Sequence, residues 1–142
     1  MSGTLTVAVC GGRNYADAEQ VFKSLDRVHA IAPIEVLIHG AAPGADTLAE
    51  NWAKSREVNY VGIPAKWKKH GYPAGPIRNS EVVASSPLIH FLIAFPGGTG
   101  TADMVKKCEA REIPILRSPG RIRVSSIQQR ALVQEPALSD RG

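Results

Sequence analysis

The sequence has little cysteine and no long hydrophobic run. Its two cysteines, Cys10 and Cys108, are too few for a disulfide scaffold or a four-cysteine metal site. Each lies beside apolar residues, so we expect two buried, reduced thiols. No stretch approaches the roughly 18 apolar residues of a membrane span, and the first residues lack a basic segment followed by an apolar core. The chain is therefore predicted to be soluble and cytoplasmic, with no membrane partner.

Several catalytic and cofactor motifs are also missing. The histidines are scattered, with no glutamate or cysteine at the spacing of metal ligands, so no metal site is predicted. The absence of a Gly-x-Ser-x-Gly elbow disfavours a serine hydrolase. Neither Gly-x-Gly-x-x-Gly nor Gly-x-x-x-x-Gly-Lys-Ser/Thr occurs. An ordinary dinucleotide dehydrogenase and a nucleoside triphosphatase are therefore disfavoured, and no cofactor is predicted.

The composition that remains is that of one small globular domain. The chain has 142 residues, of which 44% are hydrophobic and 21% are charged, so wholesale disorder is excluded. The net charge is +4, which favours anionic partners such as nucleotides, phosphates or nucleic acid.

Short apolar runs alternate with segments of helical periodicity. This pattern predicts strands over 4–10, 34–39, 59–63, 88–95 and 113–117, and helices over 17–30, 46–56, 77–85 and about 101–111. Asp17 is placed to cap the first helix. The run over 88–95 is the most apolar and is the candidate central strand. Such regular alternation predicts an α/β fold, a Rossmann-like doubly wound, mostly parallel sheet of about five strands with helices on both faces.

Two segments fall outside this alternation. Residues 64–76 hold three prolines and two glycines and are expected to form a long loop. Residues 118–142 are expected to be a partly disordered C-terminal extension of the domain formed by residues 1–117, although Ile122, Val124 and Ile127 could pack as an added strand.

Three loops that contain glycine follow predicted strands and precede predicted helices. In doubly wound folds such loops gather at the carboxyl ends of the strands, where free backbone N–H groups and helix N-termini favour phosphate. The strongest candidate is Pro96-Gly97-Gly98-Thr99-Gly100-Thr101, with three glycines and two hydroxyls in six residues. Thr101 could cap the following helix or donate to a phosphate oxygen.

The other two loops add polar side chains. The second contains Gly40, Gly44, Ala45 and Asp46, and Asp46 is placed as an N-cap. The third is Gly11-Gly12-Arg13-Asn14-Tyr15. There Arg13 could bind a phosphate and Tyr15 could stack on a base, or they could be a surface arginine and a packed tyrosine.

Four further features could contribute to a site. Arg78, at the start of a predicted helix, could reach a phosphate or a ribose hydroxyl, and Asn79 offers a donor and an acceptor. Asp103 could bind ribose, act as a base, or only favour the helix N-terminus. The lysines around Trp67 could form a nucleic-acid patch, a lid over a phosphate ligand, or simply a solvated loop.

Taken in order, these motifs resemble a known superfamily. Gly11-Gly12-Arg13, Gly40-x-x-x-Gly44-Ala45-Asp46, Arg78-Asn79 and Pro96-Gly97-Gly98-x-Gly100-Thr101 resemble the SLOG superfamily, over about residues 4–117. That superfamily includes Lonely guy phosphoribohydrolases, DNA-processing protein A and nucleotide-sensing domains, and the YspA- or YpsA-related branch looks most similar. The resemblance implies a nucleotide or nucleotide-derived ligand whose phosphate lies on the glycine loop after the fourth strand, and it implies a homo-oligomer.

The resemblance also bears on catalysis. In Lonely guy enzymes an arginine and a glutamate assist cleavage of the N-glycosidic bond, and Arg78 matches that arginine. The glutamate position is Met104 in this chain; Asp103 is adjacent, but one residue along a helix turns a side chain by about 100°. We therefore favour a module that senses or sequesters a nucleotide-derived ligand. The alternatives are a nucleoside monophosphate phosphoribohydrolase that uses Arg78 and Asp103, and a protein that binds single-stranded DNA.

Overall fold

A computed structural model describes residues 3–84 and 88–132 of the protein. Its centre is a five-stranded parallel sheet of order β3-β2-β1-β4-β5. The strands are β1 (Leu5–Cys10), β2 (Ile34–His39), β3 (Asn59–Gly62), β4 (Phe91–Ala94) and β5 (Ile115–Arg117). This arrangement confirms the predicted Rossmann-like α/β fold.

The middle strand is β1, not the strand predicted over 88–95. After β3 the chain returns to the opposite side of β1, so β4 pairs with β1 on one side and with β5 on the other. The high apolarity of β4 comes from burial on both faces of the sheet, which both β1 and β4 experience.

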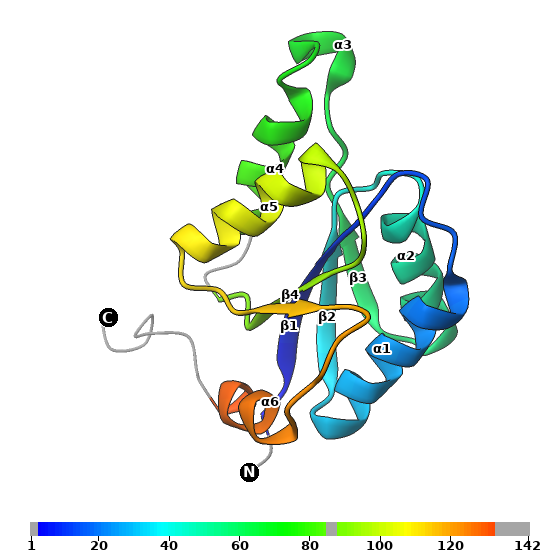
Figure 1. Ribbon diagram of the computed structural model, residues 1–142, viewed down its shortest axis with the longest axis vertical. Coiled ribbons are helices and arrows are strands. Elements are labelled where there is room, and N and C mark those ends of the chain that lie inside the picture. Colours follow the sequence, from blue (N-terminus) through cyan, green and yellow to red (C-terminus); the bar gives the residue numbers. More distant parts are fainter. Residues whose placement is uncertain (1–2, 85–87, 133–142) are drawn as a thin grey trace.

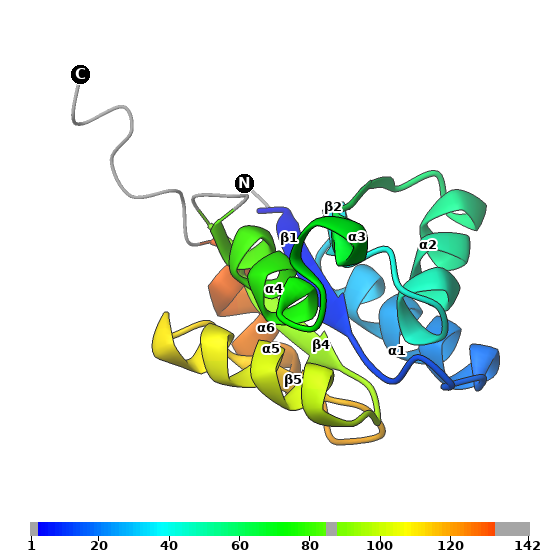
Figure 2. The same ribbon diagram turned by 90° about the horizontal axis from the view of Figure 1, so that it is seen from above.

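Helices cover both faces of the sheet (Figures 1 and 2). On one face lie α1 (Ala18–Ile31) and α2 (Ala45–Ser55), and on the other lie α4 (Ala74–Ala84) and α5 (Thr99–Ala110). The short helix α3 (Trp67–His70) protrudes beyond the sheet in Figure 1. Asp17 caps α1 as predicted, since its side chain accepts a hydrogen bond from the Gln20 amide at 3.0 Å.

Alternate residues of each strand supply two apolar cores. In β1, Leu5, Val7 and Val9 belong to the core beneath α1 and α2, whereas Ala8 and Cys10 belong to the core beneath α4 and α5. Both cysteines are buried and free, as predicted. Burial raises the pKa of Cys10 to about 12 and that of Cys108 to about 11, so both thiols stay protonated at neutral pH.

The segment predicted as a long loop is partly helical. It contains α3, whose C-cap is Gly71 with a φ of +66°, and it contains the first turn of α4. The prolines and glycines of this segment indicate a loop, but Pro76 lies in the first turn of α4, where a missing backbone N–H costs no helical hydrogen bond.

The chain after β5 forms the helix α6 (Val124–Ala131) and not an added strand. Ile127 and Ala131 are four residues apart, which is helical spacing, and both are buried with the core near α1. Gly3 lies against the Ala131 carbonyl, so closely that a side chain at Gly3 would collide with it. Residues 133–142, for which we predicted disorder, lie outside the described residues, and the boundary at residue 117 stays a prediction.

Within the described ranges, no helix is both long enough and apolar enough to cross a membrane.

Candidate functional site

The three glycine loops meet at the carboxyl edge of the sheet. The Gly12 amide donates to the Pro96 carbonyl at 2.8 Å, and the Gly12 carbonyl accepts from the Ala45 amide at 3.1 Å. These two bonds tie the loop after β1 to the loops after β4 and β2. The structure therefore brings together the backbone segments that the sequence singled out.

Some glycines of these loops are required by the fold itself. A side chain at Gly44, whose φ is +79°, would collide with the Gly12 carbonyl. A side chain at Gly97 would collide with the Thr101 hydroxyl and would lie 2.8 Å from the Gly12 amide nitrogen. These positions allow the loops to pack against one another.

Gly98 and Gly100 are different. A Cβ atom built on either would meet no atom within 4 Å, and neither residue has a positive φ. Both residues are exposed at the start of α5. Close packing does not explain why glycine stands there, and the backbone is left open to an approaching ligand.

The start of α5 differs from the prediction. The helix begins at Thr99 with Gly98 as the N-cap, so Thr101 lies in the first turn and does not cap it. No side chain caps the helix. The first N–H groups of a helix have no partner inside it, and they carry the positive end of the helix dipole. This end of α5 can therefore accept an anion.

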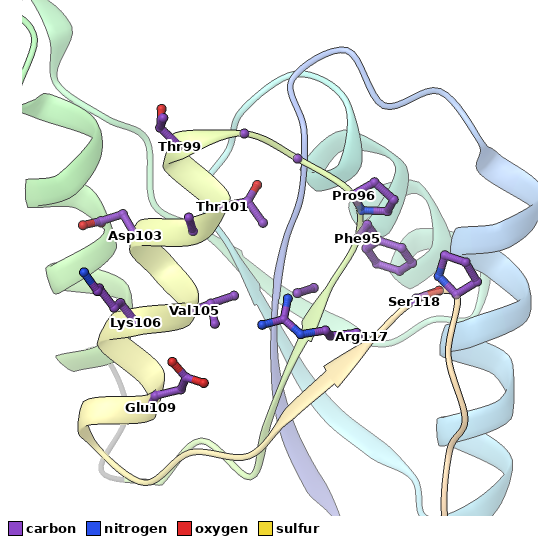
Figure 3. A pocket seen from close by; sticks show the side chains of 15 residues that line it. Phe95, Pro96, Thr99, Thr101, Asp103, Val105, Lys106, Glu109, Arg117 and Ser118 are labelled. Carbon is purple, nitrogen blue, oxygen red and sulfur yellow. The ribbon is translucent and has the colours of Figure 1, made fainter.

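A cavity of about 770 Å³ lies beside this loop, between α5 and the end of β5 (Figure 3). Its walls carry two cations, Lys106 and Arg117, and two acids, Asp103 and Glu109. In Figure 3 the Arg117 side chain extends from the end of β5 into the cavity toward α5. Our sequence reasoning missed Arg117, although its place at the end of the last predicted strand put it at the carboxyl edge.

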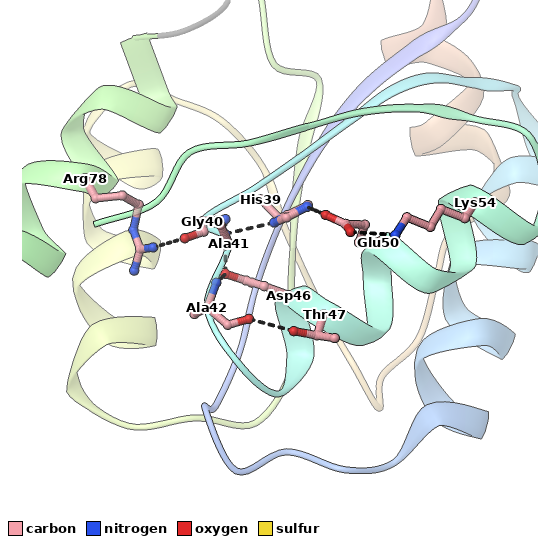
Figure 4. Close-up of polar contacts among 9 residues, drawn as sticks. All are labelled: His39, Gly40, Ala41, Ala42, Asp46, Thr47, Glu50, Lys54 and Arg78. Carbon is pink, nitrogen blue, oxygen red and sulfur yellow. Dashed lines mark hydrogen bonds and ion pairs between the residues drawn. The ribbon is translucent and has the colours of Figure 1, made fainter. Parts of the chain in front are cut away.

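Arg78 belongs to α4, and its side chain lies against the loop after β2 (Figure 4). Its Nη1 donates to the Gly40 carbonyl, and its Nε donates to the Asn79 Oδ1 at 3.0 Å. A side chain at Gly40 would collide with the guanidinium, so glycine makes room for it. Burial lowers the pKa of Arg78, and the nearby Arg13 lowers it further, against the opposing effect of Asp46. An arginine nevertheless stays a cation in a protein.

Asn79 and Asp103 are coupled to each other. The Asn79 Nδ2 donates to the Asp103 Oδ2 at 2.9 Å and to the Gly100 carbonyl at 3.2 Å, and the Lys107 Nζ lies 2.6 Å from Asp103. Partial burial would raise the pKa of Asp103, but the hydrogen bonds from Lys107 and Asn79 lower it overall. Asp103 is thus a bound carboxylate that fixes Asn79 beneath the glycine loop. The neighbouring Met104 is buried in the core.

Asp46 does not cap α2, contrary to the prediction. The N-cap is Gly44, and the Asp46 carboxylate turns back to accept from the amides of Gly40 at 3.0 Å and Ala42 at 3.2 Å. The helix begins one residue earlier than predicted, so Asp46 falls inside its first turn. Burial raises the pKa of this carboxyl group, against the amide of Ala42 and the cations around it. Its role is to hold the loop in shape.

His39 and Glu50 support the same loop, and sequence reasoning missed this pair. The His39 Nδ1 accepts from the Ala41 amide at 2.9 Å, which leaves Nε2 to donate to Glu50, also at 2.9 Å (Figure 4). Glu50 in turn pairs with Lys54 at 3.1 Å. His39 is buried, so these contacts support the loop after β2 from the interior of the protein. In the described part of the chain, no group of three or more His, Cys, Asp or Glu residues could hold a metal ion.

Arg13 and Tyr15, the two candidate ligand-binding side chains of the loop after β1, have different surroundings in the structure. Tyr15 packs against Phe95 with ring centroids 5.7 Å apart, so it supports the loop and matches the packed alternative. Arg13 is exposed, and its guanidinium lies over the Trp67 ring, 5.7 Å from the centroid. This contact joins the loop after β1 to α3.

Comparison with known proteins finds a matching family, a relative in a phage and a solved structure of similar fold. Residues 5–70 match the model of the YspA, cpYpsA-related SLOG family. The chain is 32% identical to the Gene 61 protein of Mycobacterium phage D29 over 118 residues, which cover 78% of this chain and 93% of that protein. It also resembles the X-ray structure of DNA processing protein A from Streptococcus pneumoniae, with a TM-score of 0.65 and 16% identity.

The structural likeness covers 92% of this chain but only 58% of DNA processing protein A, so it concerns the fold alone. The residues that the family model matches include the glycine loops after β1 and β2. The chain belongs to the YspA, cpYpsA-related SLOG family.

Proposed function

We propose that this protein binds a nucleotide or nucleotide-derived molecule on the loop after β4, as a sensor or a sequestering module. The observation that carries the proposal is the pair Gly98 and Gly100. These glycines leave the backbone open at the N-terminus of α5, where packing against the rest of the protein does not require glycine. Open amides at the positive end of a helix are the usual cradle of a phosphate group.

Charge and space around the loop support the same ligand class. Arg78 belongs to α4, which contacts the start of α5 through Asn79, and its guanidinium lies against the Gly40 carbonyl. Arg117 extends into the cavity beside α5. Guanidinium groups form strong, directional hydrogen bonds with phosphate oxygens. The cavity volume of about 770 Å³ lies within the range of small-molecule sites.

The side chains around the loop favour binding over cleavage of the N-glycosidic bond. Met104 is buried and cannot ionise, and Asp103 is occupied by Lys107 and Asn79. A carboxylate whose pKa is lowered is a poor general acid at neutral pH. The phosphoribohydrolase alternative would need Asp103 to leave both partners.

The substitution Gly98→Val tests the proposal. A Cβ atom at this position would meet nothing within 4 Å apart from its chain neighbours, so we expect the fold to persist while the new side chain fills the space over the amides. We expect adenosine monophosphate, titrated by calorimetry, to bind the parent protein and to bind this variant at least tenfold more weakly. Native mass spectrometry of freshly purified protein should also show a retained nucleotide.

The matched control is Ala110→Val, which adds similar bulk at the exposed far end of the same helix. It should bind like the parent protein, and both variants should keep their melting temperatures and circular dichroism spectra. Equal binding by Gly98→Val, or no binding of any common nucleotide by the parent protein, would contradict the proposal. Release of free base from adenosine monophosphate would favour the phosphoribohydrolase instead.

A further inference from the structure

We propose that Trp67 is the platform on which the nucleobase of the ligand stacks, and that Arg13 covers this face of the ring in the free protein. This inference rests on the proposed function and names the part of the ligand that the glycine loop does not recognise. It assigns α3, which the sequence marked only as part of a loop with several possible roles, to the recognition of an aromatic base.

Trp67 is held in place but remains open to solvent. Its side chain is 45% exposed, in contrast to the fully buried Trp52. The backbone of α4 passes close to the ring, since a Cβ atom on Gly75 would lie 3.3 Å from its Cη2. Gly75 therefore lets the indole rest against α4, and the Arg13 guanidinium lies over the ring.

A short series of contacts joins this ring to the glycine loop. Gly75 precedes Arg78 by one helical turn in α4, and Asn79 donates to the Gly100 carbonyl. On the other side, Arg13 follows Gly12, whose amide donates to the Pro96 carbonyl. Trp67 is thus one step removed from the glycine loop: it contacts Gly75 and Arg13, and the contacts with the loop are made by Asn79, one turn along α4, and by Gly12, the residue before Arg13.

The two arginines of this region favour an anionic ligand. Arg13 lies close enough for its charge to act on Arg78. Two like charges held near each other are unfavourable until an anion lies between or beside them. A nucleotide would relieve this repulsion with its phosphate and would bring a planar base at the same time.

A guanidinium and a nucleobase are both planar groups that stack on an indole ring. We infer that the base takes the place of the Arg13 guanidinium on Trp67, and that the released guanidinium turns toward the phosphate beside Arg78. The cavity next to α5 offers no comparable platform among the described residues that line it, because Phe95, the one aromatic side chain in that set, is 2% exposed.

The test compares a ligand that has a base with one that lacks it. For Trp67→Leu we expect adenosine monophosphate to bind about tenfold more weakly or worse, as for the loss of one base–aromatic stack. Ribose 5-phosphate should bind the parent protein and the variant within twofold, because it has no base. Trp67→Phe keeps an aromatic ring and should restore most of the affinity.

Tyr72→Ala is the matched control, because Tyr72 is an aromatic residue next to α3 that is 93% exposed. Its loss should leave both affinities unchanged. Fluorescence adds an independent signal: adenosine monophosphate should quench the exposed Trp67, and Trp67→Phe should abolish the quenching because Trp52 is buried.

The outcomes separate this inference from the proposed function. Equal affinity of the parent protein for adenosine monophosphate and ribose 5-phosphate would overturn the stacking platform and leave the phosphate cradle standing. Binding of neither compound would overturn both. If Trp67→Leu weakened binding of a single-stranded oligothymidylate but not of adenosine monophosphate, the surface would belong to nucleic acid, and the mononucleotide assignment would be wrong.

Discussion

Gly97 and Gly98 are neighbours in the chain, but their surroundings differ. Gly97 packs against the loop after β1, whereas a side chain at Gly98 would extend into open space. The first glycine serves the fold, and the second leaves room for something outside the chain. Sequence patterns alone give both residues the same weight, and only the surroundings of each Cα atom separate the two roles.

Thr99→Pro would remove a single amide from the cradle. Thr99 is the first residue of α5, where proline is well tolerated because its missing N–H has no partner in the helix. We expect adenosine monophosphate to bind roughly tenfold more weakly, since a hydrogen bond to a charged group is worth about 1.5–3 kcal/mol. Calorimetry measures the affinity, and circular dichroism checks that the helix persists.

Thr99→Ser is the control for that change, because it keeps the amide and a hydroxyl. It should bind like the parent protein. Unchanged affinity in Thr99→Pro would mean that this amide does not contact the phosphate.

At the scale of elements, α4 and α5 are tied together at the site. Asn79 of α4 donates both to Asp103 and to the backbone of Gly100 in α5, and Lys107 completes the group. This tie positions Arg78, the residue before Asn79, relative to the glycine loop. Stability and site geometry are therefore linked through one carboxylate.

The stability that the contacts of Asp103 with Asn79 and Lys107 contribute should depend on pH. The pKa of Asp103 is lower in the folded protein than its ordinary value of 3.8, so its contribution is present above that value and is lost as the pH falls through the folded pKa. We expect Asp103→Asn to destabilise the protein by about 1 kcal/mol at pH 7, with the difference shrinking toward zero at acid pH. Thermal unfolding between pH 7 and pH 3 measures this.

Glu81→Gln, on the exposed side of α4, is the matched control and should show no such trend. A difference that stays constant across the whole pH range would mean that the ionised carboxylate is not what stabilises the tie.

Most of the elements could be predicted from the sequence, because apolar runs bounded by glycine alternate with helical periodicity. The predictions of where helices begin were wrong where they rested on a single residue type, proline or a polar N-cap candidate. Pro76 indicated a loop but lies in the first turn of α4. Asp46 was predicted to cap α2, and Thr101 either to cap α5 or to donate to a phosphate, but both helices have glycine N-caps. A glycine N-cap leaves no side-chain signature, so the sequence favours the nearest polar residue instead.

For the candidate site, the meeting of the glycine loops could be predicted from the sequence, but the roles of several side chains could not. Strand order brings the glycine loops together in any doubly wound sheet, so their meeting followed from the pattern. The roles of Arg117, Glu50 and the pair Arg13 and Trp67 depend on packing between segments far apart in the chain, which local patterns do not encode.

At the scale of the whole molecule, the sheet ends in two outer strands, β3 and β5. Each has one row of backbone N–H and C=O groups that no strand of the described chain pairs, and β3 is exposed along its whole length. Unpaired strand edges are common sites of association between chains.

We therefore predict self-association, as the superfamily resemblance also implies. Light scattering coupled to size exclusion should give a mass that is a multiple of 15.2 kDa. Titrating the protein concentration should shift the equilibrium and show whether assembly is reversible. A mass of one chain at high concentration would refute the prediction.

The position of Gly3 against Ala131 has a practical consequence. Both residues lie at the amino edge of the sheet, and the six residues of β1 separate this edge from Gly11 by about 20 Å. A fluorophore or a chip linker attached near that edge would project away from the phosphate cradle. Protein immobilised through this edge should therefore keep the glycine loops at the carboxyl edge of the sheet open to ligand.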